Sequence, residues 1–294
     1  MPEIIPETNH SLPVFIDSSI QIAKTVREPP MKRRIAEWLL RHGPAITGLA
    51  ALQEFKRRVL RDVAYLLSKL AKTESYQATL DHVTSVLTPH QVRKQRICIP
   101  LLHQILIGRS DEELTERARL YLRALLVTGE EQFKREWRLI DGGLDCYWAK
   151  FPIRERKRYL NYDFGDTCCS KSHGRCEIGA DLHDRLETCK KLFEYLRGLP
   201  PERLSPELES ARNILGRIVG AKNPEDIQNE DLCLTAGDML LAIDSEHTRE
   251  FFTMNYRESQ AYCDFFDQNL TIRPNNPAHD ERSYLTSEKP WPSS

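Results

Sequence analysis

Four acidic side chains that lie far apart in the sequence have the chemistry of a divalent-metal site. Asp17 ends a short apolar run, and Glu54 lies in the first turns of a helical pattern. Asp238 opens a later helical pattern, and Glu258 follows a second apolar run that ends at Asn255. Carboxylates that meet oppose each other's ionisation, and a hard cation such as Mg²⁺ or Mn²⁺ relieves that repulsion through oxygen ligands. These five residues are therefore the candidate catalytic set.

Short apolar runs predict the strands that would bring these side chains together. They lie at residues 12–16, 45–48, 250–255 and 270–272. Helical patterns at 19–26, 31–42 and 49–72 separate the early runs, with Pro29-Pro30 as a break. This order predicts an α/β protein with a parallel sheet and right-handed crossovers. A carboxylate that follows such a strand faces the crevice where open α/β sheets hold ligands.

The middle of the chain, residues 75–222, shows no strand pattern and predicts mainly helices. Ser110 with Glu113 predicts the N-cap of one of them. Because so long a stretch cannot be a loop inside a compact domain, we predict a helical insertion or a second domain. The predicted division is a first core part at 10–74, an insertion at 75–225, a second core part at 226–275 and an extended tail at 276–294.

Composition and charge limit the function classes. The net charge of −1 gives no global field that attracts nucleic acid, so any such contact needs a local basic patch. No apolar run is long enough to span a bilayer, and residues 1–10 lack the features of a signal peptide. We therefore expect a cytoplasmic protein without membrane contact, whose eight cysteines are thiols or metal ligands.

The ordered motifs resemble those of the PIN-domain nucleases, which include many toxin endoribonucleases. That family shows an apolar strand ending in Asp, a helix-borne Glu, an Asp opening a late helix and a Thr-x-Asn/Asp element. The matching segments are Val14-Phe15-Ile16-Asp17-Ser18-Ser19, Ile46-Thr47-Gly48 leading to Glu54-Phe55, Leu234-Thr235-Ala236-Gly237-Asp238-Met239-Leu240-Leu241-Ala242 and Phe252-Thr253-Met254-Asn255-Tyr256-Arg257-Glu258. The chain departs from the family in its long insertion and in Asn255, which leaves either a weaker ligand at this position or Glu258 as its substitute.

The resemblance implies a PIN-like parallel sheet and an endonuclease dependent on Mg²⁺ or Mn²⁺, acting on RNA more readily than on DNA. Asp17, Glu54 and Asp238 would be the metal ligands, completed by Asn255 or Glu258. By family analogy alone, the protein would be a toxin or defence effector that stays inactive until it is triggered. Its partner would be a regulatory protein or further copies of the same chain, as a homo-oligomer. The alternatives are an inactive PIN-like RNA-binding or assembly module and a helical scaffold.

Three of the four acidic residues also have a structural interpretation, and Asn255 can be a turn residue at the end of a strand. Asp17 can cap the helix that follows it. Glu54 can form ion pairs with Arg57 and Arg58, three and four residues further on. Asp238, three residues after Thr235, fits a capping arrangement.

Basic residues interleaved with aromatic ones follow Tyr147-Trp148 and suit phosphate contact with base stacking. The candidate nucleic-acid contacts are Arg154, Arg156, Lys157 and Arg158, which Arg57 and Arg58 would extend toward the metal site. The alternative is a solvated basic turn.

A second local signal is a cysteine- and histidine-rich stretch. Cys169, His173, Cys176 and Cys189 have ligand types that suit structural Zn²⁺, although their spacing fits no standard zinc finger. Free thiols are the alternative.

Overall fold

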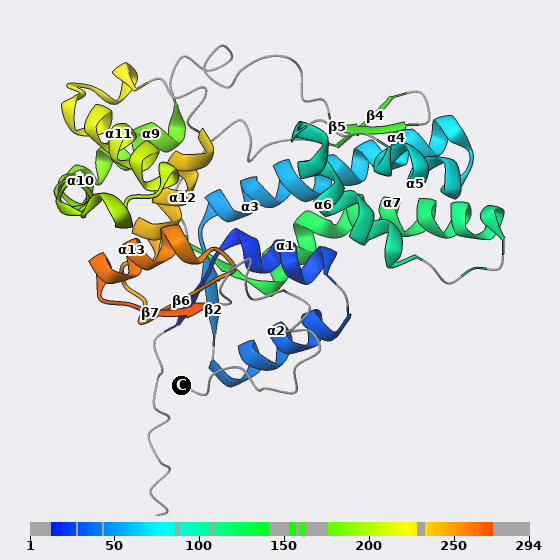
Figure 1. Ribbon diagram of the computed structural model, residues 1–294, viewed down its shortest axis with the longest axis horizontal. Coiled ribbons are helices and arrows are strands. Elements are labelled where there is room, and N and C mark those ends of the chain that lie inside the picture. Colours follow the sequence, from blue (N-terminus) through cyan, green and yellow to red (C-terminus); the bar gives the residue numbers. More distant parts are fainter. Residues whose placement is uncertain are drawn as a thin grey trace, which may run out of the picture.

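A five-stranded, all-parallel sheet forms the centre of the protein, in the order β3-β2-β1-β6-β7. The computed structural model (Figure 1) describes residues 13–27, 29–42, 44–85, 89–105, 108, 110–140, 153–156, 159–162, 176–227 and 233–272. The strands are β1 (Val14–Ile16), β2 (Ala45–Thr47), β3 (Arg138–Leu139), β6 (Glu250–Thr253) and β7 (Asn269–Ile272). The predicted α/β class with a parallel sheet is confirmed.

The central strand β1 is buried along its whole length. Phe15 lies opposite Ile46 of β2 and opposite Phe251 of β6. The rings of Phe15 and Phe251 stack at 5.3 Å between centroids, and Trp38 packs on Phe252 at 4.1 Å. A run of β-branched and aromatic residues favours a strand covered on both faces, which explains why this segment lies in the middle of the sheet.

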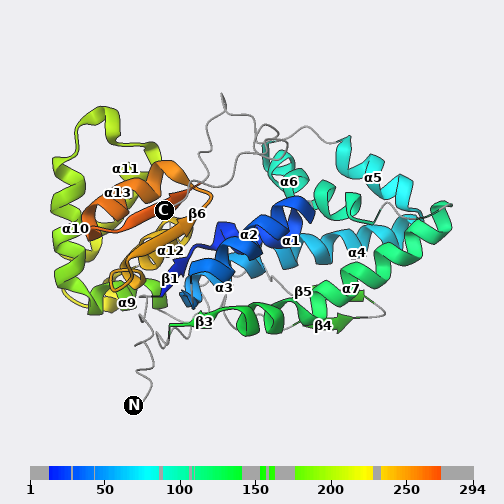
Figure 2. The same cartoon turned by 90° about the horizontal axis from the view of Figure 1, so that it is seen from below.

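Helices cover both faces of the sheet, and Figures 1 and 2 place α1–α7 on one side and α9–α13 on the other. The first group comprises α1 (Ser18–Val26), α2 (Pro29–His42), α3 (Leu49–Phe55), α4 (Arg61–Thr73), α5 (Tyr76–Thr84), α6 (Pro89–His103) and α7 (Asp111–Glu136). The second comprises α9 (Glu177–Asp184), α10 (Leu186–Gly198), α11 (Pro206–Gly220), α12 (Cys233–Asp244) and α13 (Tyr256–Phe266), with short 3₁₀ turns η2 (Pro201–Arg203) and η3 (Pro224–Asp226).

The strand order creates a switch point beside β1. The chain proceeds from β1 to β2 and β3 on one side, and then returns to form β6 on the other side of β1. In open α/β sheets, ligands bind outside the carboxyl ends of the strands at such a point. Asp17 follows β1 directly, and Thr253 ends β6.

Helix α3 continues through a π-helical turn, η1 (Lys56–Leu60), into α4. The predicted helix at 49–72 is therefore confirmed, although its pattern gave no sign of the π turn. Lys56 is only 2% exposed, and its Nζ lies 2.7 Å from Glu130 Oε2 on α7. π turns are frequent at functional sites, and this one begins two residues after Glu54.

The predicted absence of strands between residues 75 and 222 is wrong. β3 extends the main sheet by pairing with β2, and β4 (Ile153–Arg156) forms an antiparallel hairpin with β5 (Tyr159–Tyr162). β3 has two residues and no apolar run, so its pairing with β2 rather than its own sequence makes it a strand. Part of the predicted insertion therefore belongs to the sheet.

Two local predictions also need correction. Pro29 and Pro30 open α2 instead of breaking the chain, because proline is tolerated in the first turn of a helix. Asp238 lies in the second turn of α12, which begins at Cys233. The Ser110 cap is confirmed, since its Oγ accepts the Glu113 N–H at 3.2 Å. The predicted tail at 276–294 lies outside the described residues.

None of the helices in the described part of the chain combines the length and the apolar character that crossing a membrane requires.

The Lys56–Glu130 pair provides a test of how the π turn is held. We expect Glu130→Ala to destabilise the protein by about 1–3 kcal/mol, because it deprives a buried ammonium of its carboxylate. Thermal or urea unfolding measures the change. Glu131→Ala, on the exposed side of α7, is the matched control and should change little. An equal loss of unfolding free energy in both variants would contradict this role for Glu130.

Candidate functional site

Asp17 joins the ends of β1 and β6. Its Oδ2 accepts the Ser19 N–H at 3.4 Å and the Thr253 hydroxyl at 2.7 Å, and it also accepts the Ser19 hydroxyl. Ser19 Oγ in turn accepts the Met254 N–H at 2.8 Å. Asp17 therefore caps α1 and lies at the switch point at once, so its structural and functional interpretations are compatible.

Glu54 reaches the same place from α3. Its carboxylate accepts a hydrogen bond from Ser18 Oγ. It also forms an ion pair with Arg58, whose Nε lies 2.7 Å from Glu54 Oε1. The residue is 9% exposed, and burial raises the pKa of its carboxyl, with Arg58 opposing and Asp17 reinforcing the shift. Ser18 thus connects Glu54 to Asp17, and the predicted ion pair is confirmed for Arg58.

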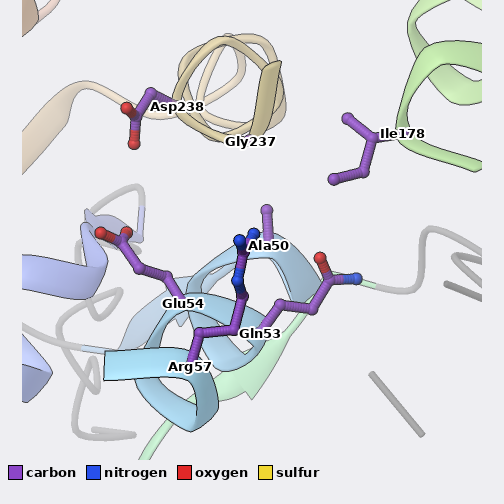
Figure 3. Close-up of a pocket in the computed structure, with 7 residues that line it drawn as sticks. All are labelled: Ala50, Gln53, Glu54, Arg57, Ile178, Gly237 and Asp238. Atoms are coloured by element: carbon purple, nitrogen blue, oxygen red, sulfur yellow. The ribbon is translucent and has the colours of Figure 1, made fainter. Parts of the chain in front are cut away.

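Asp238 approaches from α12, on the other side of the sheet. Figure 3 shows its carboxylate and that of Glu54 pointing toward each other. Among the described residues it has no hydrogen-bond or ion-pair partner. Burial, followed by the charges of Glu54, Asp17 and Glu258, raises the pKa of Asp238 well above its usual value. The protein thus holds this carboxyl where its ionised form is disfavoured.

Glu258, on α13, is the fourth member of the cluster. Burial raises the pKa of its carboxyl and the Asn255 side chain opposes the shift by a hydrogen bond. The charge of Glu207, followed by those of Asp17 and Glu54, reinforces it. The Asn255 N–H donates to Thr253 Oγ1 at 2.9 Å. Asn255 therefore lies close enough to Glu258 to favour its ionised form, and Glu258 supplies the acidic group at this end of the cluster.

Sequence reasoning missed Tyr262, which lies one helical turn after Glu258. Its side chain is buried, and its pKa is raised well above the usual value by burial and then by Asp238 and Glu258. The spacing of four residues on a helix was the available signal.

A small pocket lies between α3 and α12, and its volume of about 10 Å³ is enough for about one water molecule (Figure 3). Its lining combines both carboxylates with a cation, an amide and small residues: Ala50, Gln53, Glu54, Arg57, Ile178, Gly237 and Asp238. Of these residues, the charged ones could be named as site candidates from the sequence. Gln53 and Ile178 were missed because their positions depend on how α3, α9 and α12 pack.

The donor set suits a hard cation, because carboxylate and hydroxyl oxygens are what Mg²⁺ and Mn²⁺ prefer. However, the described residues include no group of three or more His, Cys, Asp or Glu side chains placed to hold a metal ion. Ser18 lies between Asp17 and Glu54, and Arg58 contacts one oxygen of Glu54. The cluster therefore has the chemistry of a metal site, but its side chains are not gathered around one point.

The predicted basic contacts divide into two groups. Arg57 lines the pocket and Arg58 pairs with Glu54. Arg154 and Arg156 lie on β4, whose partner β5 packs against α4, away from the switch point in Figures 1 and 2. Lys157 and Arg158 lie outside the described residues.

Two of the four candidate zinc ligands can be located. Cys176 caps α9, where its Sγ accepts the Gly179 N–H at 3.3 Å. Cys189 donates to the Leu182 carbonyl at 3.1 Å, and burial raises the pKa of its thiol to about 12. Because a metal binds the thiolate, this environment favours a buried thiol at Cys189. Cys169 and His173 lie outside the described residues.

Comparison of the chain with protein-family models, with curated proteins and with solved structures gave no match. The PIN-domain resemblance therefore rests on the ordered motifs. An open parallel α/β sheet hosts many unrelated activities, so the function has to be inferred from the carboxylate cluster itself.

The raised pKa of Asp238 predicts how stability depends on pH. Its usual value is 3.8, and folding favours the protonated form. This contribution is complete below about pH 4 and is lost as the pH rises through the raised pKa. In chelator-treated protein, we expect Asp238→Asn to be more stable than the wild type at pH 8, by about 1–3 kcal/mol, with a smaller difference at pH 5. Thermal unfolding at both pH values measures this.

Asp264→Asn is the control, because Asp264 lies on α13 at the surface and pairs with Arg203. It should give no stabilisation at either pH. A destabilised Asp238→Asn variant at pH 8 would contradict the electrostatic account of the cluster.

Proposed function

We propose that the protein is a metal-dependent endonuclease that hydrolyses phosphodiester bonds, with single-stranded RNA as the favoured substrate. The observation that supports this most is the convergence of Asp17, Glu54, Asp238 and Glu258 from four separate segments. Each of the last three has its pKa raised in part by other members of the cluster. A divalent cation is the simplest ligand that removes this repulsion.

In this proposal Asp17, Glu54 and Asp238 hold the cation, and Glu258 completes the set. A carboxylate has about four acceptor positions, so Glu54 can keep its bond to Arg58 and still bind a cation. When bound, the cation lowers the pKa of a water molecule and neutralises the charge that develops on phosphate. Hydrolysis would leave a 5′-phosphate and a 3′-hydroxyl.

The hydroxyl groups position the acids. Ser19 and Thr253 both donate to Asp17, and Ser18 donates to Glu54. These bonds fix the direction of two carboxylates before substrate arrives, which lowers the entropic cost of assembling the site. Arg58 limits the net negative charge that an approaching phosphate meets.

The proposal predicts that Asp17→Asn and Asp238→Asn lose at least about 100-fold in cleavage, since each removes a charge that binds the cation. The assay follows a labelled single-stranded RNA with Mg²⁺ or Mn²⁺ on a denaturing gel. Mn²⁺ should also raise the Tm of the wild type and not that of Asp238→Asn. Asp264→Asn should cleave normally. Wild-type rates in Asp17→Asn would rule out its role as a ligand.

A catalytically inactive RNA-binding or assembly module is the second candidate. Two observations favour it. Ser18 and Arg58 already contact Glu54, and the acids of the described residues are not close enough together to surround a metal ion. RNA binding that does not change with Mn²⁺, without cleavage, would support it. A toxin or defence role belongs to the proposal by analogy and is tested by expressing the wild type and Asp17→Asn in cells.

A further inference from the structure

A second cavity, of about 240 Å³, lies between α1, α2 and α7 and shares no lining residue with the pocket at Glu54 and Asp238. One water molecule needs about 10–15 Å³ of such volume, so this cavity has room for a small organic molecule. Its wall also includes Phe55, at the end of α3. All of these helices lie on the same side of the sheet (Figures 1 and 2).

Lys32 brings a positive charge to the wall of this cavity without a carboxylate to match it. Its Nζ donates to Gln104 Oε1 at 2.8 Å, and no Asp or Glu side chain in the described part of the chain pairs with it. The side chain is half-buried, and burial lowers the pKa of its ammonium group. A buried charge is costly unless an opposite charge compensates it. An ammonium group has three donors, so two remain for a ligand.

Gln104 holds Lys32 at the cavity. The amide nitrogen of Gln104 donates to the Val26 carbonyl at 2.9 Å. Its Oε1 accepts the Tyr121 hydroxyl at 3.0 Å in addition to the Lys32 ammonium. Both lone pairs of this oxygen are therefore used, and its orientation is determined. The ammonium group is fixed by a neutral partner, which leaves its charge available to an anion.

Gln21 adds a buried donor to the same wall. It is 5% exposed, and its Oε1 accepts the Trp137 indole N–H at 2.8 Å. Because an indole N–H can only donate, this bond directs the amide nitrogen of Gln21 away from Trp137. That nitrogen donates to none of the described residues, yet it is not enclosed and keeps accessible surface. A buried donor without a partner calls for an explanation such as a ligand.

The other charges of the wall compensate each other. Lys24 Nζ lies 2.8 Å from Glu136 Oε2 and 5.1 Å from the centre of the Trp137 ring. Phe55 and Leu125 contribute apolar surface. The cavity thus combines one unmatched positive charge with a neutral donor and an apolar wall. This combination suits a molecule that has a single negative charge, a second acceptor and an apolar body.

We propose that this cavity binds a small organic carboxylate, with its carboxylate group on Lys32 and a second acceptor on Gln21. Gln21 lies one helical turn before Thr25, whose carbonyl accepts from Gln104, so the two donors are separated along α1. The second acceptor must therefore lie on the body of the ligand, at a distance from the carboxylate. The inference does not depend on the proposed function, because the carboxylate cluster contributes nothing to this cavity.

The test uses 4-hydroxybenzoate, which has a carboxylate, an apolar ring and a hydroxyl group opposite the carboxylate. In isothermal titration calorimetry with the full chain, we expect it to bind and to raise the Tm. Benzoate should bind several-fold more weakly, and uncharged benzamide at least about tenfold more weakly, because it loses the charge-assisted bond. Equal binding of benzamide, tighter binding of inorganic phosphate, or no binding of either carboxylate at millimolar concentration would overturn the proposal.

Lys32→Gln should weaken binding of 4-hydroxybenzoate at least about tenfold, whereas Lys32→Arg, which keeps the charge, should stay within about threefold of the wild type. Arg33→Gln is the matched control, because it removes one positive charge from the neighbouring, exposed position of α2 and should bind normally. The Tm without ligand shows whether each variant is folded. A wild-type Kd in folded Lys32→Gln would overturn the site.

Gln21→Glu tests the second donor. The variant keeps an oxygen that can accept the Trp137 indole N–H but replaces the amide nitrogen by a charged oxygen, so it should weaken binding at least about tenfold. Asp238→Asn, at the carboxylate cluster, should bind 4-hydroxybenzoate as the wild type does. Loss of binding in Asp238→Asn, or its retention in Gln21→Glu, would place the ligand elsewhere and overturn the proposal.

Discussion

The parallel pairing of β1 with β6 is the constraint on which the candidate site depends. It sets Ile16 opposite Phe252, so that Asp17 and Thr253 leave the sheet at the same edge. The 2.7 Å bond from the Thr253 hydroxyl to Asp17 then joins residues 236 positions apart. A slip of one residue would send one of these side chains to the opposite face, so the register of two buried apolar runs determines whether the acids meet.

That register brings together groups that repel one another. Asp238 lies near Glu54, Asp17 and Glu258, and the charges of Arg58 and Arg57 offset part of their repulsion. Such an arrangement lowers the stability of the ionised protein, and natural proteins keep costs of this kind mainly where function needs them. The same reasoning applies to Gln53, whose buried Nε2 has no hydrogen-bond partner in the described part of the chain.

The sequence predicted the parts of the fold that carry strong local patterns. The apolar runs before Asp17 and Asn255 became β1 and β6, and the helical pattern after Gly48 became α3 and α4. The sequence did not predict β3, which is too short to have a pattern, or the π turn, which depends on Lys56 reaching Glu130 on another helix.

The site could be predicted only in part for the same reason. A carboxylate is a possible metal ligand wherever it occurs in the sequence. The candidates could therefore be named before their proximity was known: Asp17, Glu54, Asp238 and Glu258. Gln53 and Tyr262 are ordinary residue types whose importance comes from burial beside those acids. Asn255 was named as a ligand candidate, but its effect on the pKa of Glu258 follows from the turn into α13.

The free energy of the Arg58–Glu54 ion pair can be compared with the cost of burying the carboxylates of this cluster. Arg58 is 45% exposed, and pairs of this kind at i, i+4 contribute about 0.3–0.5 kcal/mol. Placing an ionised carboxylate in a buried environment costs several kcal/mol unless it is paired. Glu54 has Ser18 and Arg58 as partners, whereas Asp238 has none among the described residues. A surface ion pair therefore cannot offset the burial of Asp238, and the fold instead favours the neutral form of this carboxyl by raising its pKa.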